Sequence, residues 1–363
     1  MAPDAGKLKL RVTWDGNTVR RVDTVAARPQ AFRLLHGKAP ESAVQLARLL
    51  FNVCGNAQGA AAAAAIAAAQ DRPLAEWAVL ERSIAREAMQ EHLWRLLLDW
   101  PRVLELPQAQ ADFVRWHGML RGMAAGQGAM SELRAELEAG WLGIAAADWL
   151  ALSSLDELQH WWRSTDSPAA RLLAALERMD QASAPNYSVE LLPEWTAQQA
   201  LQACGDGLDA DFSAQPRHRG LPAETGALGY HATAPLLADT LQQRPARVLA
   251  RVLARVCAAL HIAAERDQGW LDYSHTADGG GLAVVRTARG LLLHRVRLAA
   301  GVVEDYVTVA PTEWNFHPRG ALAAGLEGMQ VDARGKLARL AGMHILSLDP
   351  CVDYAIEING SVA

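Results

Sequence analysis

The chain has 363 residues, of which 51% are hydrophobic, and its formal net charge is −5. This length allows a large buried core and, taken alone, about two or three domains. Because the 35 lysines and arginines are interspersed with 40 acidic residues, the sequence lacks the basic surface typical of nucleic acid binding, and nucleic acid is not an expected partner.

Two stretches are candidates for a secretory signal and for a membrane-spanning helix. Residues 1–10 lack the apolar core and the cleavage site of a secretory signal, so we expect a cytoplasmic protein. The most apolar run, residues 59–69, is mostly alanine and much shorter than the roughly 20 apolar residues that a membrane helix needs. The sequence therefore predicts no membrane span.

The cysteines are too irregularly spaced to suggest a disulfide framework. In a reducing compartment we expect them to be free thiols or metal ligands. They are Cys54, Cys204, Cys257 and Cys351.

The N-terminal region predicts a β-hairpin followed by a helix. Apolar and polar residues alternate over residues 8–14, the pattern of a half-buried strand. A turn at residues 15–17 then leads into a weaker strand at 19–22. After Pro40, residues 41–51 are predicted to be helical, and they bring the chain to Cys54.

An alanine-rich helix is predicted directly after Cys54. Alanine dominates residues 57–70, and it combines the highest helix propensity with a thin profile that lets neighbouring backbones approach. A thiol at the positive end of this helix should have a lowered pKa and favour the metal-binding thiolate. Taken alone, the stretch fits a buried, inert Cys54 equally well.

The middle of the chain predicts helices without recognisable chemistry. Apolar residues recur at helical spacing over residues 89–100, and Pro101 is expected to end that helix. His92 lies beside the apolar stripe and is more simply a surface or core-edge residue than a ligand. Residues 113–178 continue in helical style, with tryptophans that fill space between helices.

Residues 183–222 lose this periodicity and predict a long irregular connection with short ordered pieces. Cys204 within it has no helical run behind it and is interpreted as structural. A helix is predicted from 244 to 264, and Cys257 lies among its apolar residues, which favours a place in the core.

The last third changes character. β-rich runs between residues 282 and 309 predict a small antiparallel ribbon. Helices are expected at 319–327 and 332–343, before the segment that contains Cys351.

Several landmarks then occur in a recognisable order. Residues 52–61 keep the first cysteine of the pattern Arg-x-Cys-Gly-x-Cys-x-x-x-His, and residues 349–357 keep the first cysteine of Asp-Pro-Cys-x-x-Cys-x-x-His. Between them, residues 224–228, 287–294 and 310–315 are similar to Glu-Val-Gly-Pro-Leu, Ala-Pro-Arg-Gly-x-x-x-His and Val-Pro-Thr-Thr-Trp-Asn. From about residue 7 to 363 the chain resembles the large subunit of nickel-iron hydrogenases, and more closely its catalytically silent relatives of the HupK/HoxV type, described as scaffolds in hydrogenase maturation.

The resemblance implies an α+β, mainly helical fold. We expect a single large-subunit-like domain over residues 1–363, with small antiparallel β elements near the N-terminus and around 282–309. The N-terminal and C-terminal cysteine segments should meet in its core.

The resemblance also implies roles for matched residues. In the family, the arginine and the Ser/Thr of the last two motifs face cyanide ligands of the iron, so Arg289 and Thr312 inherit that role. Pro311 and Asp349 belong to the matched motifs and complete the candidate cofactor-binding set. Without the family, Arg289 would be an ordinary charged turn residue and Thr312 a candidate helix N-cap.

Departures from the pattern argue against an active hydrogenase. Ala57 and Tyr354 stand where the second cysteine of each pair is expected, and the histidines of both motifs are absent. The chain is short for a large subunit, begins after the usual Arg-Ile-Glu-Gly-His segment, and lacks the terminal processing signal. We therefore expect no nickel and no catalysis.

What remains suits a carrier of iron. Soft thiolates of Cys54 and Cys351 suit low-spin iron, and an Fe(CN)2CO unit brings ligands of its own. Arg289 and Thr312 could donate hydrogen bonds to its cyanide nitrogens. The expected partners are hydrogenase maturation proteins, namely a small assembly chaperone and the iron-cyanide assembly complex, and the hydrogenase large subunit precursor.

Three questions stay open at this point. The retained cysteines are those that bind nickel terminally in the family, so either the iron is displaced or Cys54 and Cys351 swing inward. A metal-free protein that docks assembly chaperones is an alternative. A further alternative function is an enzyme with Cys54 as nucleophile and a nearby histidine such as His294 as its base.

Overall fold

The structure is a computed structural model, and it describes residues 7–26, 31–51, 53–180, 189–204, 208–244, 246–266 and 268–360. Position 52 of the first cysteine motif, the first six residues, and residues 183–188 and 205–207 of the predicted connection lie outside these ranges.

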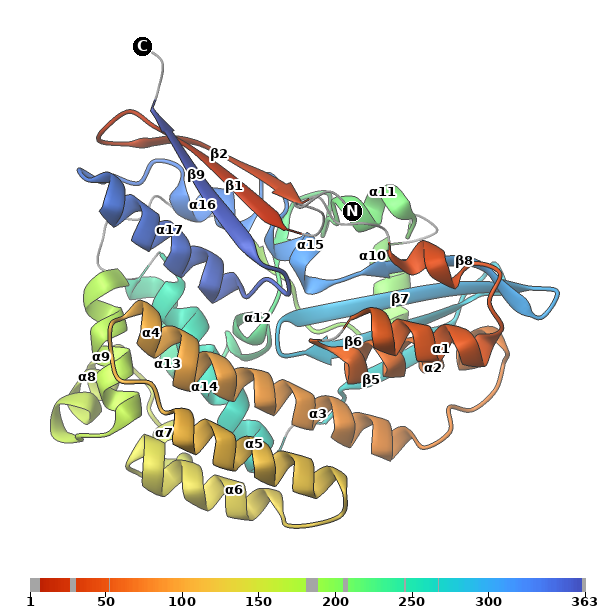
Figure 1. Cartoon of the computed structure of the whole chain (residues 1–363), viewed down its shortest axis with the longest axis horizontal. Helices are drawn as coiled ribbons and strands as arrows, with labels where there is room; N and C mark the ends of the chain where they lie inside the picture. The colour runs from red at the N-terminus through yellow and green to blue at the C-terminus, as the bar shows by residue number, and fades with distance from the viewer. Residues whose placement is uncertain are drawn as a thin grey trace.

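The N-terminal hairpin belongs to a sheet that joins both ends of the chain. The strands β1 (Leu8–Trp14) and β2 (Val19–Ala26) pair antiparallel, which confirms the predicted hairpin. A further strand, β9 (Tyr354–Gly360), which the sequence did not predict, pairs in parallel with β1. Figure 1 shows this sheet at one edge of the molecule, so the segment after Cys351 is tied to the start of the chain.

The second sheet is antiparallel and has the order β5-β6-β7-β8. The predicted ribbon over 282–309 is confirmed, and the structure adds one more strand at its side. The strands are β5 (Leu271–His275), β6 (Gly281–Thr287), β7 (Gly290–Ala299) and β8 (Val302–Val309).

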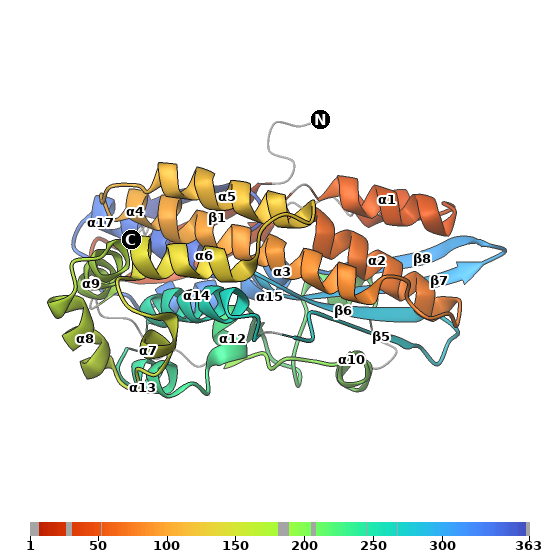
Figure 2. The ribbon, with the colours of Figure 1, turned by 90° about the horizontal axis from the view of Figure 1, so that it is seen from below.

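The alanine-rich helix α2 (Gly55–Ala69) packs directly on this sheet, and α1 (Pro40–Leu50) covers α2 (Figures 1 and 2). The approach is so close that a Cβ atom at Gly281 would lie 2.0 Å from the carbonyl oxygen of Ala65. Only a glycine in the strand and alanines on the helix allow this spacing, which confirms the predicted thin helix.

The sequence predicted that Pro101 ends the long helix, and this prediction is wrong. The helix α3 (Trp77–Trp94) continues through a π-helical turn (Arg95–Asp99) into α4 (Trp100–Val103). A proline clashes with the carbonyl four residues before it in a regular α-helix. The wider π turn just before Pro101 accommodates the ring and lets the helix pass through it.

The helix predicted from 244 to 264 starts later. The helix α13 (Pro235–Gln243) ends first, and α14 (Val248–Ala263) begins only after Arg247, whose φ of 61° breaks helical geometry. Nearly every residue of α14 is buried, including Cys257 as predicted. This helix is buried on all sides although it carries Arg251 and Arg255, and it contacts α3, α9, α12, α13 and α17.

Short helices make up most of the remaining chain, which gives the predicted α+β, mainly helical architecture. The part of residues 189–222 that the structure describes holds only short elements, as expected for a connection. No helix in the described parts of the chain is long and apolar enough to cross a membrane. The remaining elements are η1 (Ala31–Leu35), α5 (Gln110–Ala124), α6 (Met130–Leu137), a π turn (Glu138–Leu142), α7 (Ala146–Leu150), α8 (Leu155–Ser164), α9 (Pro168–Asp180), β3 (Glu190–Leu191), α10 (Ala197–Cys204), α11 (Ala210–Ala214), β4 (Ala223–Glu224), α12 (Ala227–His231), α15 (Pro311–Asn315), α16 (Ala321–Leu326) and α17 (Arg334–Leu348).

Candidate functional site

Cys54 is the N-cap residue of α2, and it is half-buried against the core. The helix starts at Gly55, where a Cβ atom would lie 2.8 Å from the carbonyl oxygen of Arg48 on α1. Its first free N–H groups, those of Asn56 and Ala57, donate to the carboxylate of Glu87 on α3 at 2.7 and 3.0 Å. A carboxylate from another helix therefore occupies the positive end of α2.

The predicted lowering of the Cys54 pKa is wrong. Burial raises the pKa of this thiol to about 12, although the positive charge of Arg289 and the amide of Gln58 act in the opposite direction. The helix does not compensate because its N-terminal N–H groups already bind Glu87. In the metal-free protein Cys54 is thus a protonated thiol at neutral pH.

A buried chain of hydrogen bonds leads from Cys54 to the sheet. The amide nitrogen of Gln58 donates to the sulfur of Cys54 at 3.6 Å, and its oxygen lies 2.8 Å from Nε2 of His294. Because that amide oxygen can only accept, Nε2 carries the proton and Nδ1 accepts from the Tyr306 hydroxyl at 2.7 Å.

This chain argues against His294 as a catalytic base for Cys54. Gln58 stands between the two side chains, and both ring nitrogens of His294 are already engaged. Burial also lowers the pKa of His294 to about 3, so the imidazole is a poor proton acceptor. The arrangement does not support a Cys–His nucleophile.

Cys351 follows α17 across a sharp turn. Asp349 is the C-cap of that helix with a φ of 55°, a left-handed conformation that aspartate tolerates better than most residues. The hydroxyl of Thr312 lies 3.3 Å from the sulfur of Cys351. Thr312 is not a helix N-cap, because α15 begins with Pro311 after the N-cap Ala310. Its hydroxyl therefore contacts the thiol instead of the helix terminus.

Three arginines surround the carboxylate of Asp349. Arg95 donates to it from the π turn at 2.8 Å, Arg255 from α14 at 2.9 Å, and Nε of Arg289 lies 3.5 Å away. Burial alone would raise the pKa of Asp349, but the three cations outweigh it and hold this pKa below the usual carboxyl range. Asp349 is therefore ionised at neutral pH.

Arg289 is buried in the turn between β6 and β7 and is no ordinary surface turn residue. Its guanidinium forms an ion pair with Glu91 of α3, besides its contact with Asp349. The thiols of Cys54 and Cys351 lie close enough to Arg289 that their ionised forms would raise its pKa. Figure 1 shows this turn beside the end of α17 and the start of β9.

The arginine is held in place by its neighbours in the turn. Gly290 has a φ of 130°, and a Cβ atom there would lie 2.5 Å from the side chain of Thr225. The Thr225 hydroxyl accepts from the N–H of Leu291 at 2.9 Å, and the Thr225 N–H donates to Asn315 at 2.8 Å. These hydrogen bonds connect the three matched motifs at residues 224–228, 287–294 and 310–315 around Arg289.

The predicted site residues thus lie around one guanidinium. Cys54, Cys351, Thr312 and Asp349 come together there, while Pro311 serves as the first residue of α15. The two positions that lack the second cysteine do not contribute a ligand: Ala57 is fully buried in α2, and the Tyr354 hydroxyl points toward Gly342 of α17.

Sequence reasoning missed two carboxylates of α3 and one cation of the π turn that follows it. Glu87, Glu91 and Arg95 take part in the site, and burial raises the pKa of Glu91 to about 7. The available signal was their helical spacing from the buried residues Ile84 and Ala88, which places charged groups on the apolar face. His92 is also buried there, with Nδ1 3.2 Å from Arg255.

No group of three His, Cys, Asp or Glu side chains in the described ranges is arranged to hold a metal ion. The thiols of Cys54 and Cys351, the two soft ligands of the site, are both half-buried. A metal bound here would need to bring further ligands of its own.

The fold and these motifs define the class of the protein. A family model described as nickel-dependent hydrogenase matches residues 208–357. The reduced nickel-iron-selenium hydrogenase of D. vulgaris Hildenborough has a TM-score of 0.63 at 14% identity, over 93% of this chain and 94% of that chain. The corresponding enzyme of Desulfomicrobium baculatum gives 0.61 at 14%, over 94% and 95%. The chain has the hydrogenase large-subunit fold.

Two relatives identify the family to which the chain belongs within this fold class. The hydrogenase expression/formation protein HoxV of Cupriavidus necator is 33% identical, over 92% of this chain and 92% of its own length. The hydrogenase expression/formation protein HupK of Azotobacter vinelandii is 32% identical, over 98% and 99%. The chain belongs to the HoxV/HupK family of hydrogenase expression/formation proteins.

Proposed function

We propose that the protein is a scaffold in nickel-iron hydrogenase maturation that carries an Fe(CN)2CO unit on the thiolates of Cys54 and Cys351. The observation that supports this most directly is the place of these thiols. They come from segments far apart in the sequence, and both lie close enough to buried Arg289 for their ionised forms to raise its pKa. The expression/formation names of the relatives agree with a maturation role and not with catalysis.

The chemistry of the unit matches the groups present. Thiolates are soft ligands that suit low-spin iron, and cyanide and carbonyl fill the positions for which the protein supplies no side chain. The guanidinium of Arg289 and the hydroxyl of Thr312 are hydrogen-bond donors for cyanide nitrogens. Nickel is not expected, because Ala57 and Tyr354 supply no bridging sulfur.

Loading should release protons. The pKa of the Cys54 thiol is raised to about 12, so iron must displace its proton on binding. Affinity for the unit should therefore be weaker than at a site with preformed thiolates. Weak holding is useful in a carrier that passes its cargo on, with the iron-cyanide assembly complex and a small chaperone as donors and the large subunit precursor as acceptor.

Infrared spectroscopy and iron analysis test this function. Protein purified without oxygen from a host with an intact maturation system should show cyanide and carbonyl stretching bands and about one iron per chain. Cys54→Ala and Cys351→Ala should each lose them. Cys204→Ala is the matched control, because that thiol ends α10 away from Arg289, and it should keep them. Wild-type protein without bands and without iron would refute the proposal.

A metal-free docking protein is the second candidate. It is favoured by the absence of a three-ligand cluster among the described residues and by the protonated state of Cys54. In that case Cys54→Ala and Cys351→Ala would support hydrogenase maturation as well as wild type does. A maturation defect in either variant, with normal thermal stability, speaks for the carrier.

A further inference from the structure

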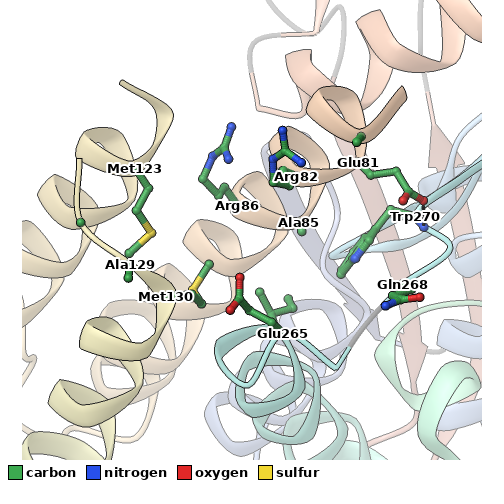
Figure 3. A pocket seen from close by; sticks show the side chains of 13 residues that line it. Glu81, Arg82, Ala85, Arg86, Met123, Ala129, Met130, Glu265, Gln268 and Trp270 are labelled. Carbon is green, nitrogen blue, oxygen red and sulfur yellow. Dashed lines mark hydrogen bonds between the residues drawn. The ribbon is translucent and has the colours of Figure 1, made fainter. Parts of the chain in front are cut away.

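A cavity of about 540 Å³ lies outside the cysteine site, between α3, the turn from α5 to α6, and the end of α14 (Figure 3). This volume is in the range of small-molecule sites. The groups that matter for its chemistry are Arg82, Arg86, Met123, Met130, Ile262 and Trp270.

One wall carries two positive charges. Arg82 and Arg86 are one turn apart on α3, and Figure 3 shows their guanidinium groups side by side. Arg86 is half-buried, yet no acidic side chain in the described parts of the chain lies within 4.0 Å of it. Every other buried or half-buried arginine in those parts forms an ion pair, as Arg244 does with Glu177 and Arg339 with Glu105.

The acidic residues of the cavity do not neutralise this pair. Glu81 accepts the backbone N–H of Trp270 at 2.9 Å, which holds its carboxylate at another wall. Glu265 is exposed at the end of α14 and forms no ion pair with a described residue. Burial and the neighbouring Arg82 lower the pKa of Arg86, so its charge is held at a cost that a bound anion would remove.

The facing surface is apolar and adaptable. Met123 and Met130 flank the turn between α5 and α6, Ile262 is buried at the end of α14, and Trp270 presents a buried ring. Methionine side chains adjust to the shape of a ligand, and an aromatic ring provides a large flat contact.

We propose that this cavity binds a small organic anion, whose carboxylate or phosphate lies between Arg82 and Arg86 and whose apolar part contacts the methionines and Trp270. Guanidinium groups bind carboxylate and phosphate alike, through paired N–H donors. The same two arginines can therefore recognise either anion. The site is independent of the proposed function and stands whether or not iron is bound.

Titration calorimetry on the full chain at low ionic strength tests this inference with four probes: benzoate, phenyl phosphate, inorganic phosphate and neutral benzamide. We expect benzoate or phenyl phosphate to bind at least tenfold more tightly than benzamide, and inorganic phosphate to bind more weakly than phenyl phosphate. A preference for benzoate identifies a carboxylate ligand, and a preference for phenyl phosphate identifies a phosphate ligand.

Matched variants assign the binding to the arginine pair. Arg86→Gln and Arg82→Gln should each weaken binding of the preferred anion at least tenfold. Arg163→Gln removes an exposed arginine of α8 outside the cavity and should change nothing. Because Arg82 is exposed, its variant remains informative if Arg86→Gln unfolds. Equal binding of benzamide, no binding of any probe, or wild-type affinity in the Arg82 variant would overturn the inference.

Discussion

At the scale of single residues, the site depends on buried charges that neutralise one another. Asp349 faces Arg95, Arg255 and Arg289, and Glu91 pairs with Arg289 from the other side. Removing one partner of such a set leaves buried charge without full compensation in the core, which is far more unfavourable than losing a surface ion pair. The turn that presents Cys351 therefore depends on the carboxylate that precedes it.

Asp349→Asn tests this dependence. The amide keeps the size of the side chain but removes the carboxylate that three arginines share. Arg289 keeps Glu91 and Arg95 keeps Asp99, whereas buried Arg255 has no other carboxylate partner among the described residues, so we expect the free energy of unfolding at pH 7 to fall by about 3–5 kcal/mol. Urea denaturation measures the change. Asp332→Asn is the control, because its ion pair with Lys336 is exposed, and it should have little effect.

The difference between wild type and Asp349→Asn should also depend on pH. The folded-state pKa of Asp349 is lowered, so the folded protein binds fewer protons here than the unfolded chain. This contribution is present above the unfolded pKa of about 4 and is lost as the pH falls below it. A difference that stays constant from pH 7 to pH 3 would contradict the assignment.

At the scale of elements, α2 sets the position of Cys54. Its alanine side chains let the helix lie against β6, and Glu87 of α3 fixes its first turn. Gln58 then extends from the first turn of α2 toward both Cys54 and His294 of β7. The thiol is placed by helix-to-sheet packing and not by the local sequence around it.

Gly281→Ala should disrupt this packing. A methyl group 2.0 Å from the carbonyl oxygen of Ala65 forces α2 away from the sheet, and we expect a loss of about 3 kcal/mol or more in stability. Gly335→Ala is the matched control. It lies in the first turn of α17 with nothing within 4 Å of an added Cβ, so alanine should be tolerated and change stability by less than about 1 kcal/mol. Thermal unfolding of both variants measures the contrast.

At the scale of the whole molecule, the site is built where the two ends of the chain meet. The strand β9 starts three residues after Cys351 and pairs along the full length of β1. The terminal sheet thereby limits where the segment with Cys351 can lie. The prediction that residues 1–363 form a single domain stays a prediction, and so does the iron-binding role of the matched residues.

Ile358→Ala probes the joining of the ends. This side chain is 7% exposed and packs in the main core, so truncation should lower the free energy of unfolding by about 2–4 kcal/mol. If β9 also positions Cys351, the variant should retain less iron than wild type after purification. Glu357→Ala, on the exposed face of the same strand, should match wild type in both measurements.

The sequence by itself determined the features that local patterns encode. Alternation identified the hairpin of β1 and β2, alanine content identified α2 and its start beside Cys54, and matched motifs identified Arg289, Thr312, Asp349 and Cys351. Each of these follows from residues that are close in the chain or from a motif of a few positions, so no long-range contact is needed to find it.

Only the tertiary structure decided the electrostatic state of the site. The helix dipole near Cys54 suggested a lowered pKa, but Glu87 from α3 occupies the helix terminus and burial raises the pKa instead. In the same way, a π turn overrides the stop signal of Pro101, and β9 forms because β1 offers it a free edge. Burial and pairing depend on which groups the fold brings together across hundreds of residues, and no local pattern contains that information.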